Sequence, residues 1–307
     1  MPDGDAETRK RRIAASLDRL PTLSDAVLKL FSLNSEAEDY PTRLAELLQS
    51  EPSLAARTLQ AANSAFSGPR QPVGTIPEAV VRLGGRRTGQ LLKAMSLMNI
   101  FTPRTDGEYN LWRHAVQVAV ATRVIAGASG QDLDSREAYL AGLFHDIGRF
   151  VMFEHVPQEV REIEERRLHT PSEILDLERA AYGYDHCEVG WRACQALSVP
   201  AGIGLLSKHH HSEKPTSGEL SASQLRLLRT IQQADRLSWR LLGERDIMTL
   251  DPTERVVELT SVCAPWDWTP VRPQELSMLL DYIVTWSDNL LVALGVPGPR
   301  KGGTQQS

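Results

Sequence analysis

The chain has 307 residues and a formal net charge of −5, and its 41% hydrophobic and 24% charged content is that of an ordinary globular protein. The slightly acidic balance does not favour nucleic acid as a partner. No apolar run approaches the roughly 20 residues that a membrane span needs, and the polar N-terminus lacks the apolar core of a signal peptide, so we expect a cytoplasmic protein.

Helical periodicity dominates the chain, and no alternating run predicts a strand. The charged leader, residues 1–19, is predicted to be a solvated helix end, with an anionic docking surface as the alternative. A first helical unit is predicted over residues 20–102. In it, Thr22 or Ser24 can cap the first helix, and Pro77 stands in the first turn of a later one, where its missing N–H is tolerated.

A second helical unit is predicted over residues 103–243, with helices near 109–127, 136–155, 172–182, 186–197, 200–210 and 222–242. A C-terminal extension over 244–295 carries one apolar helix near 273–294, and residues 296–307 are expected to be disordered. The predicted fold class is therefore all-α, with an N-terminal helical bundle packed on a second helical bundle.

One apolar segment of the second unit contains two residues that do not belong in a core. The stretch from Leu140 to Phe153 is apolar on nearly every side, which predicts a buried helix, yet it includes His145 and Asp146. Burying an ionised carboxylate without a partner is very costly. Asp146 therefore needs a metal ion, a histidine or Arg149, which follows three residues later.

Five further polar side chains share helical faces with apolar residues and are expected to point inward: His114, His186, His209, His210 and Asp235. Together with His145 and Asp146 they form a candidate metal cage. Mixed imidazole and carboxylate ligands suit iron, manganese, zinc or nickel, in a mono- or dinuclear site, better than calcium. Such a cage could activate water for attack on a phosphoester. On spacing alone, a metal-free hydrogen-bonded network of the same residues is the alternative.

Several short motifs carry a family resemblance over residues 20–239. In the first half they are Leu20-Pro21-Thr22-Leu23 and the segments 47–52, 61–65 and 76–84. In the second half they are the segments 111–114, 141–149 and 186–190, His209-His210 and Ala234-Asp235. With these motifs the sequence resembles the HDOD family, a relative of the HD-domain metal-dependent phosphohydrolases.

The order His, His-Asp, His, His-His, Asp is also similar to the ligand order of the HD-GYP cyclic-di-GMP phosphodiesterases, so the resemblance implies metal ligation by the seven cage residues. Three departures from those enzymes argue against efficient cyclic-di-GMP hydrolysis. Arg149 replaces a lysine, Asn110 replaces an acidic ligand, and the Gly-Tyr-Pro signature after the histidine pair is missing. Arginine stays protonated and cannot shuttle a proton, although it can bind phosphate.

The resemblance implies a bacterial signalling regulator or scaffold whose HD-like half binds a metal and a nucleotide or other phosphate ligand. Its expected partner is a kinase, a response regulator or a cyclic-dinucleotide enzyme. The rival is a metal-dependent phosphohydrolase of nucleotides or cyclic dinucleotides. In that case His145, Asp146 and Asp235 hold the metal, and Arg149 neutralises charge in the transition state. A third interpretation makes the cluster purely structural.

Overall fold

The computed structural model describes residues 3–63, 71–131, 133, 135–164, 170–213, 215, 218–243, 246–263 and 269–297. Every regular element in these ranges is helical, which confirms the predicted all-α class. No helix in the described ranges has both the length and the apolar character that crossing a membrane requires. Most of the predicted disordered tail, residues 298–307, lies outside the described residues.

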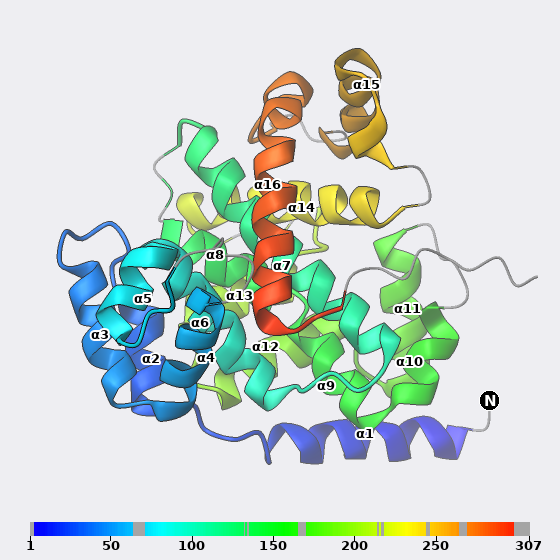
Figure 1. Ribbon diagram of the computed structural model, residues 1–307. Helices are drawn as coiled ribbons and strands as arrows, with labels where there is room; N and C mark the ends of the chain where they lie inside the picture. Colours follow the sequence, from blue (N-terminus) through cyan, green and yellow to red (C-terminus); the bar gives the residue numbers. More distant parts are fainter. Residues whose placement is uncertain are drawn as a thin grey trace, which may run out of the picture.

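The first bundle consists of helices α2 to α6, which pack on one another at one side of the molecule (Figure 1, blue to cyan). They are α2 (Asp25–Ser32), α3 (Tyr40–Gln49), α4 (Pro52–Asn63), α5 (Ile76–Leu83) and α6 (Gly85–Ile100). Local signals set two of their starts. The Ser24 hydroxyl accepts the Val27 N–H at the start of α2, and Thr75 does the same for Glu78 at the start of α5.

The second bundle is built around α7, which packs against α8, α14 and α16. Every residue of α7 from Leu111 to Thr122 is buried. The helices of this bundle are α7 (Asp106–Ala128), α8 (Ser135–Phe144), α9 (Ile147–His155), α10 (Pro157–Glu164), α11 (Pro171–Tyr182), α12 (His186–Ala196), α13 (Ala201–His209) and α14 (Ala222–Leu242).

The single helix predicted over 136–155 is in fact two helices, α8 and α9, separated by His145 and Asp146. The prediction was wrong at this point because periodicity alone does not reveal a turn between two apolar helices. The break has a structural use. Adjacent side chains of a continuous helix diverge by about 100°, whereas a turn lets His145 and Asp146 face the same buried volume.

Two glycines let the helices around this turn approach very closely. A Cβ added to Gly142 of α8 would lie 2.8 Å from the Cα of Ala119 on α7, and one added to Gly148 of α9 would lie 1.9 Å from the backbone oxygen of His186 on α12. Neither contact is with a side chain that could rotate away. The small residues therefore bring the His145–Asp146 turn against both α7 and α12.

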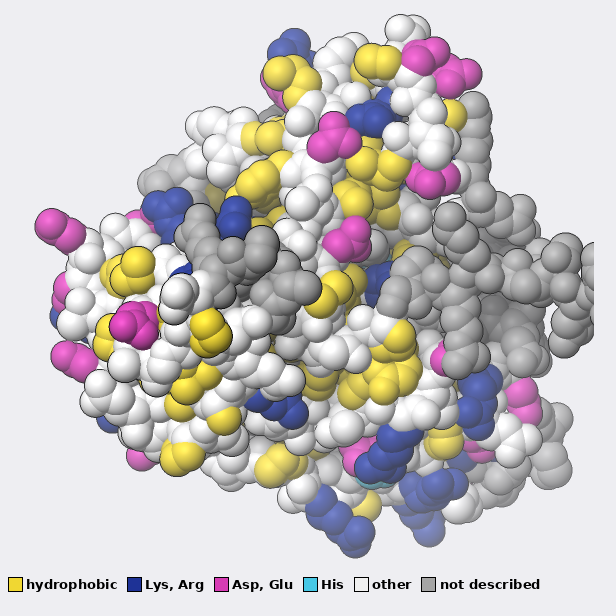
Figure 2. All heavy atoms as spheres, in the orientation of Figure 1, with side chains coloured by type: hydrophobic (Ala, Val, Ile, Leu, Met, Phe, Trp, Pro, Cys, Tyr) yellow, Lys and Arg dark blue, Asp and Glu magenta, His cyan; other side chains and the backbone are white. Residues whose placement is uncertain are grey.

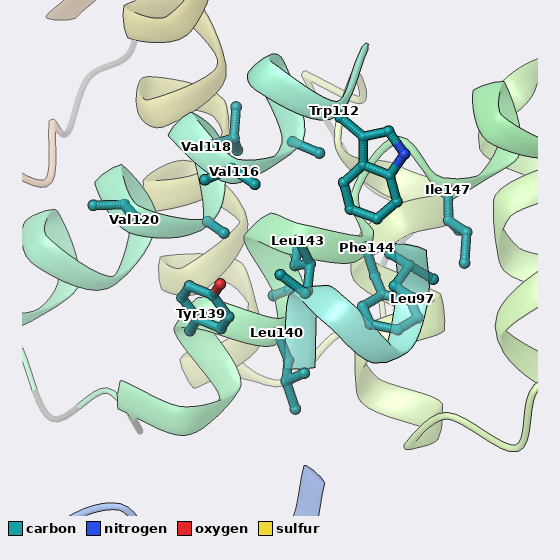
Figure 3. Packing of buried hydrophobic residues seen from close by; sticks show 14 of the residues in the cluster. Leu97, Trp112, Val116, Val118, Val120, Tyr139, Leu140, Leu143, Phe144 and Ile147 are labelled. Carbon is teal, nitrogen blue, oxygen red and sulfur yellow. The ribbon is translucent and has the colours of Figure 1, made fainter. Parts of the chain in front are cut away.

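The two bundles meet through a core that includes Leu97 of α6, Trp112 of α7 and Phe144 of α8 (Figure 3). Phe144 also makes an edge-on contact with Phe31 of α2, with 5.8 Å between the ring centroids. Because Phe144 directly precedes His145, the first bundle supports the helix end that carries the His-Asp pair.

Three more helices surround the bundles: α1 (Asp3–Leu17), α15 (Pro252–Cys263) and α16 (Pro273–Leu294), with a short 3-10 helix at Ile247–Thr249. Helix α16 crosses α7 and also contacts α6, whereas α1 lies along α9, α11 and α12 (Figure 1). The leader is thus more than the solvated helix end we predicted. Ile13 is fully buried, and the Arg9 side chain pairs with Glu159 at 2.8 Å. Lys and Arg side chains gather along the edge of the molecule where α1 lies (Figure 2).

We predict that Gly148→Ala destabilises the protein by about 3 kcal/mol or more, because the new methyl group would overlap the α12 backbone. Urea unfolding followed by circular dichroism measures the change. The matched control is Gly127→Ala, at an exposed position of α7 with nothing within 4 Å of the added Cβ. It should leave stability unchanged or raise it by up to about 1 kcal/mol. Equal effects of the two substitutions would contradict the close-approach argument.

Candidate metal centre

Six buried side chains from five parts of the second bundle converge on one volume. They come from α7, from the turn between α8 and α9, from the first residue of α12, from the residue after α13 and from α14. None of these side chains is more than 9% exposed. In chain order they are His114, His145, Asp146, His186, His210 and Asp235.

A first group of ligand atoms surrounds one oxygen of Asp146. Its Oδ1 lies 3.4 Å from Nε2 of His186 and 3.2 Å from Nε2 of His210. The half-buried ring of His211 lies against His210, with 4.0 Å between the ring centroids, and offers a fourth ligand atom. The four atoms lie within 4.8 Å of one another.

A second group lies on the other side of the same carboxylate. Asp146 Oδ2 is 3.6 Å from Nε2 of His114 and 3.6 Å from Nε2 of His145. Oδ1 of Asp235 is 3.1 Å from Nε2 of His114. Asp146 therefore stands between the two groups, with one oxygen directed at each.

Backbone carbonyl groups fix the tautomers of His145 and His210. Nδ1 of His145 lies 2.8 Å from the carbonyl oxygen of Gly142, and Nδ1 of His210 lies 2.6 Å from that of Ser207. A carbonyl only accepts hydrogen bonds, so Nδ1 must carry the proton in both rings. In its neutral form each ring then presents an Nε2 lone pair to the centre.

Side chains, not backbone carbonyl groups, fix the tautomers of His186 and His114. Nδ1 of His186 lies 2.7 Å from a carboxylate oxygen of Glu178, and Nδ1 of His114 lies 3.0 Å from the Ser238 hydroxyl. That hydroxyl donates to Gln117 and is therefore free to accept from His114. Partners of this kind orient histidine ligands in metal sites and raise their basicity.

The facing nitrogens and carboxylate oxygens fit a cation. Nε2 of His114 lies 3.2 Å from Nε2 of His145, and Nε2 of His186 lies 3.4 Å from Nε2 of His210. Ligands about 2.0–2.1 Å from one ion, at tetrahedral to octahedral angles, lie about 2.8–3.4 Å apart. While the rings are neutral and protonated on Nδ1, Nε2 cannot donate, and the buried Oδ1 atoms of Asp146 and Asp235 have no hydrogen-bond partner. This buried group could hold a metal ion at the point where these atoms converge.

In the absence of a metal ion, protons on the histidine rings can pair with the buried carboxylate oxygens. Burial lowers the pKa of His210, but Cys187 and Asp146 outweigh it and raise that pKa to about 10. Burial is likewise outweighed at His186, chiefly by the Glu178 carboxylate, so its pKa lies well above the usual value. His145 differs, because burial dominates and lowers its pKa to about 4. At neutral pH the metal-free first group therefore carries protons that a metal must displace.

The structure places His209 outside the cluster, which corrects its predicted role as a ligand, although its side chain is buried as expected. His209 is the last residue of helix α13 and His210 is its C-cap, so the two adjacent side chains diverge and only that of His210 reaches Asp146. Nε2 of His209 lies 2.5 Å from Glu219. His211, which the sequence analysis did not include, takes a place in the first group because it follows His210 in the turn.

Arg149 lies beside the cluster, with one guanidinium nitrogen 3.7 Å from Oδ2 of Asp146 and a side chain only 9% exposed. Asn110 lies outside the cluster. It is exposed, and its side-chain oxygen accepts a hydrogen bond from Arg113. Sequence reasoning also missed Glu178, since nothing in its mixed acidic and basic neighbourhood distinguishes a residue that supports His186.

The comparison with known proteins agrees with this architecture. The HDOD domain family matches residues 20–213, and the chain belongs to that family. A protein of uncharacterised function from Treponema pallidum (strain Nichols) is 25% identical over 213 residues, which are 67% of this chain and 41% of that protein. The chain thus spans about two fifths of that relative's length.

Solved structures share the fold. One is a protein from Shewanella amazonensis SB2B, provisionally described as a phosphohydrolase, with a TM-score of 0.66 and 22% identity over 92% of this chain and 98% of that one. Another is a protein from Marinobacter aquaeolei VT8, provisionally described as a signal transduction protein, with a TM-score of 0.65 and 19% identity over 95% of this chain and 66% of that one. At these identities the similarity establishes the fold alone.

We predict that untagged protein purified without oxygen contains a transition metal, and that His210→Ala removes at least half of it because the first group loses a ligand. His209→Ala, at the neighbouring position, should leave the metal content unchanged because His209 pairs with Glu219. Inductively coupled plasma mass spectrometry measures both. Equal metal contents in the wild type and both variants would contradict the assignment of ligands.

We also predict that metal binding at pH 7 releases about two protons from the first group, because the raised pKa values of His186 and His210 mean that both rings are protonated beforehand. Apparent metal affinity should therefore rise with pH up to about 10. Calorimetry of Zn²⁺ binding in buffers of different ionisation enthalpy counts the protons. The His209→Ala variant should release the same number, and release of none would show that the rings are neutral in the metal-free protein.

Proposed function

We propose that this HDOD protein is a signal-transduction regulator whose second bundle binds a transition metal and a phosphate-containing ligand. Iron, manganese, zinc or nickel suits its mixture of imidazole and carboxylate ligands. Arg149 would bind the phosphate, because its guanidinium lies next to the Asp146 carboxylate that separates the two ligand groups.

The observation that carries this proposal is the enclosure of the candidate centre. All six converging side chains are at most 9% exposed. A site that turns over substrate must exchange substrate and product quickly, whereas a site that reports occupancy need only bind. The arginine at position 149 supports the same view, since it cannot act as a proton donor or acceptor at neutral pH.

The contacts between the bundles offer a route from this site to a partner. The His145–Asp146 turn directly follows Phe144, which packs on Phe31 of the first bundle. A shift of the turn on ligand binding would therefore move that contact. We propose that a kinase, a response regulator or a cyclic-dinucleotide enzyme recognises the first bundle and that a shift of this contact would change that recognition.

A metal-dependent phosphohydrolase is the second candidate, and one observation favours it. A carboxylate that stands between two groups of ligand atoms could bridge two metal ions, and paired metals stabilise both the attacking and the leaving oxygen of a phosphoester. In that role His145, Asp146 and Asp235 would hold the metal whose hydroxide attacks phosphorus.

We predict that metal-loaded protein binds phosphate compounds but does not hydrolyse cyclic dinucleotides, nucleotides or generic phosphodiesters faster than its Asp146→Ala variant does. Chromatography of the reaction mixtures measures turnover, and calorimetry measures binding. Metal-stimulated hydrolysis at about 1 per second or faster, lost in Asp146→Ala, would instead establish the phosphohydrolase.

A further inference from the structure

One large aromatic side chain next to the candidate metal centre is exposed. Trp239 of α14 is 49% exposed, and Tyr282 of α16 is the other exposed aromatic residue in the described part of the chain. Burial of tryptophan is the rule, because its large apolar surface gains much from leaving water. An indole that remains half in solvent therefore needs another reason for its position.

Trp239 lies directly against a ligand of the second group. Its ring centroid is 5.1 Å from that of His114, with the two planes inclined by 44°. It follows Asp235 by one helical turn, so both side chains project from the same side of α14. Its neighbour Ser238 is the residue that holds Nδ1 of His114. The exposed indole is thus linked to the second ligand group by its contact with His114, its spacing from Asp235 and its neighbour Ser238.

The rest of the centre is closed around charge. The carboxylates of Asp146 and Asp235 and the guanidinium of Arg149 are all buried. A phosphate group would have partners there, in a bound metal and in Arg149. The histidine rings of the centre are enclosed, whereas Trp239 offers an exposed aromatic surface at the edge of the same site.

From this juxtaposition we infer that Trp239 is a stacking surface for a nucleobase, so that the phosphate ligand of the metal centre is a nucleotide. This inference rests on the proposed function, since it requires that the centre bind phosphate. Tryptophan stacks well on all bases, because every base presents a π face. The platform therefore selects nucleotides over other phosphate esters and leaves the choice of base to other contacts.

The test compares GMP and AMP with ribose 5-phosphate, which has the sugar phosphate without the base. Binding to full-length protein loaded with Mn²⁺ is measured by calorimetry, and the metal content of each sample is measured beside it. The variants are Trp239→Ala and Trp239→Phe, with Tyr282→Ala as an exposed aromatic control on another helix. Trp239→Phe keeps an aromatic face should the alanine variant lose metal or fold poorly.

We expect the wild type to bind the nucleotides about tenfold more tightly than ribose 5-phosphate. Trp239→Ala should remove that difference without weakening ribose 5-phosphate binding, whereas Trp239→Phe and Tyr282→Ala should keep most of it. If ribose 5-phosphate and the nucleotides bind the wild type equally, the nucleobase platform is overturned and the phosphate site stands. If no phosphate compound binds the metal-loaded protein, the proposed function fails and the platform fails with it.

Discussion

The centre of this protein depends on one buried carboxylate. Asp146 is 4% exposed and still ionised, because His145, His210 and their neighbours outweigh the effect of burial and hold its pKa well below the usual value. A carboxylate in such a place is tolerated only when positive charge surrounds it. Protons on His186 and His210 supply that charge in one state of the site, and a metal cation could supply it in another.

The helices are arranged so that this charge can be reached from several sides. The α8–α9 break turns His145 and Asp146 inward, and the closeness of α7 and α12 to that break follows from Gly142 and Gly148. Hydrogen bonds at Nδ1 then aim the four histidine rings at the carboxylate. Packing between bundles and the chemistry of the centre are therefore parts of one arrangement.

Sequence patterns predicted the all-α fold and most of the helices of the second bundle, because apolar periodicity is strong in that part of the chain. They also indicated six of the converging residues, since a polar residue on an apolar face stands out. They failed at helix ends. The assignment of His209 failed because two adjacent residues of a helix do not point at the same centre, and His211 was omitted because it lies beyond the predicted helix.

The sequence did not reveal the role of Glu178, for a different reason. It acts through its distance from His186 in space, and periodicity within one helix carries no information about a neighbouring helix. The same applies to Trp239, whose contact with His114 joins two helices that are far apart in the sequence.

Two hydrogen bonds of Glu178 connect the candidate metal centre to helices nearer the surface of the molecule. One oxygen of this residue accepts both the backbone N–H and the ring Nδ1–H of His186, so it ties α11 to the first turn of α12. A positive charge on that ring would strengthen this pairing, and its loss on metal binding would weaken it. Helix α1 rests on both of them, with Lys10 packed against Gly183 and above the ring of Tyr184. Helix α1 therefore lies over the contact between α11 and α12, which metal binding to the centre would weaken.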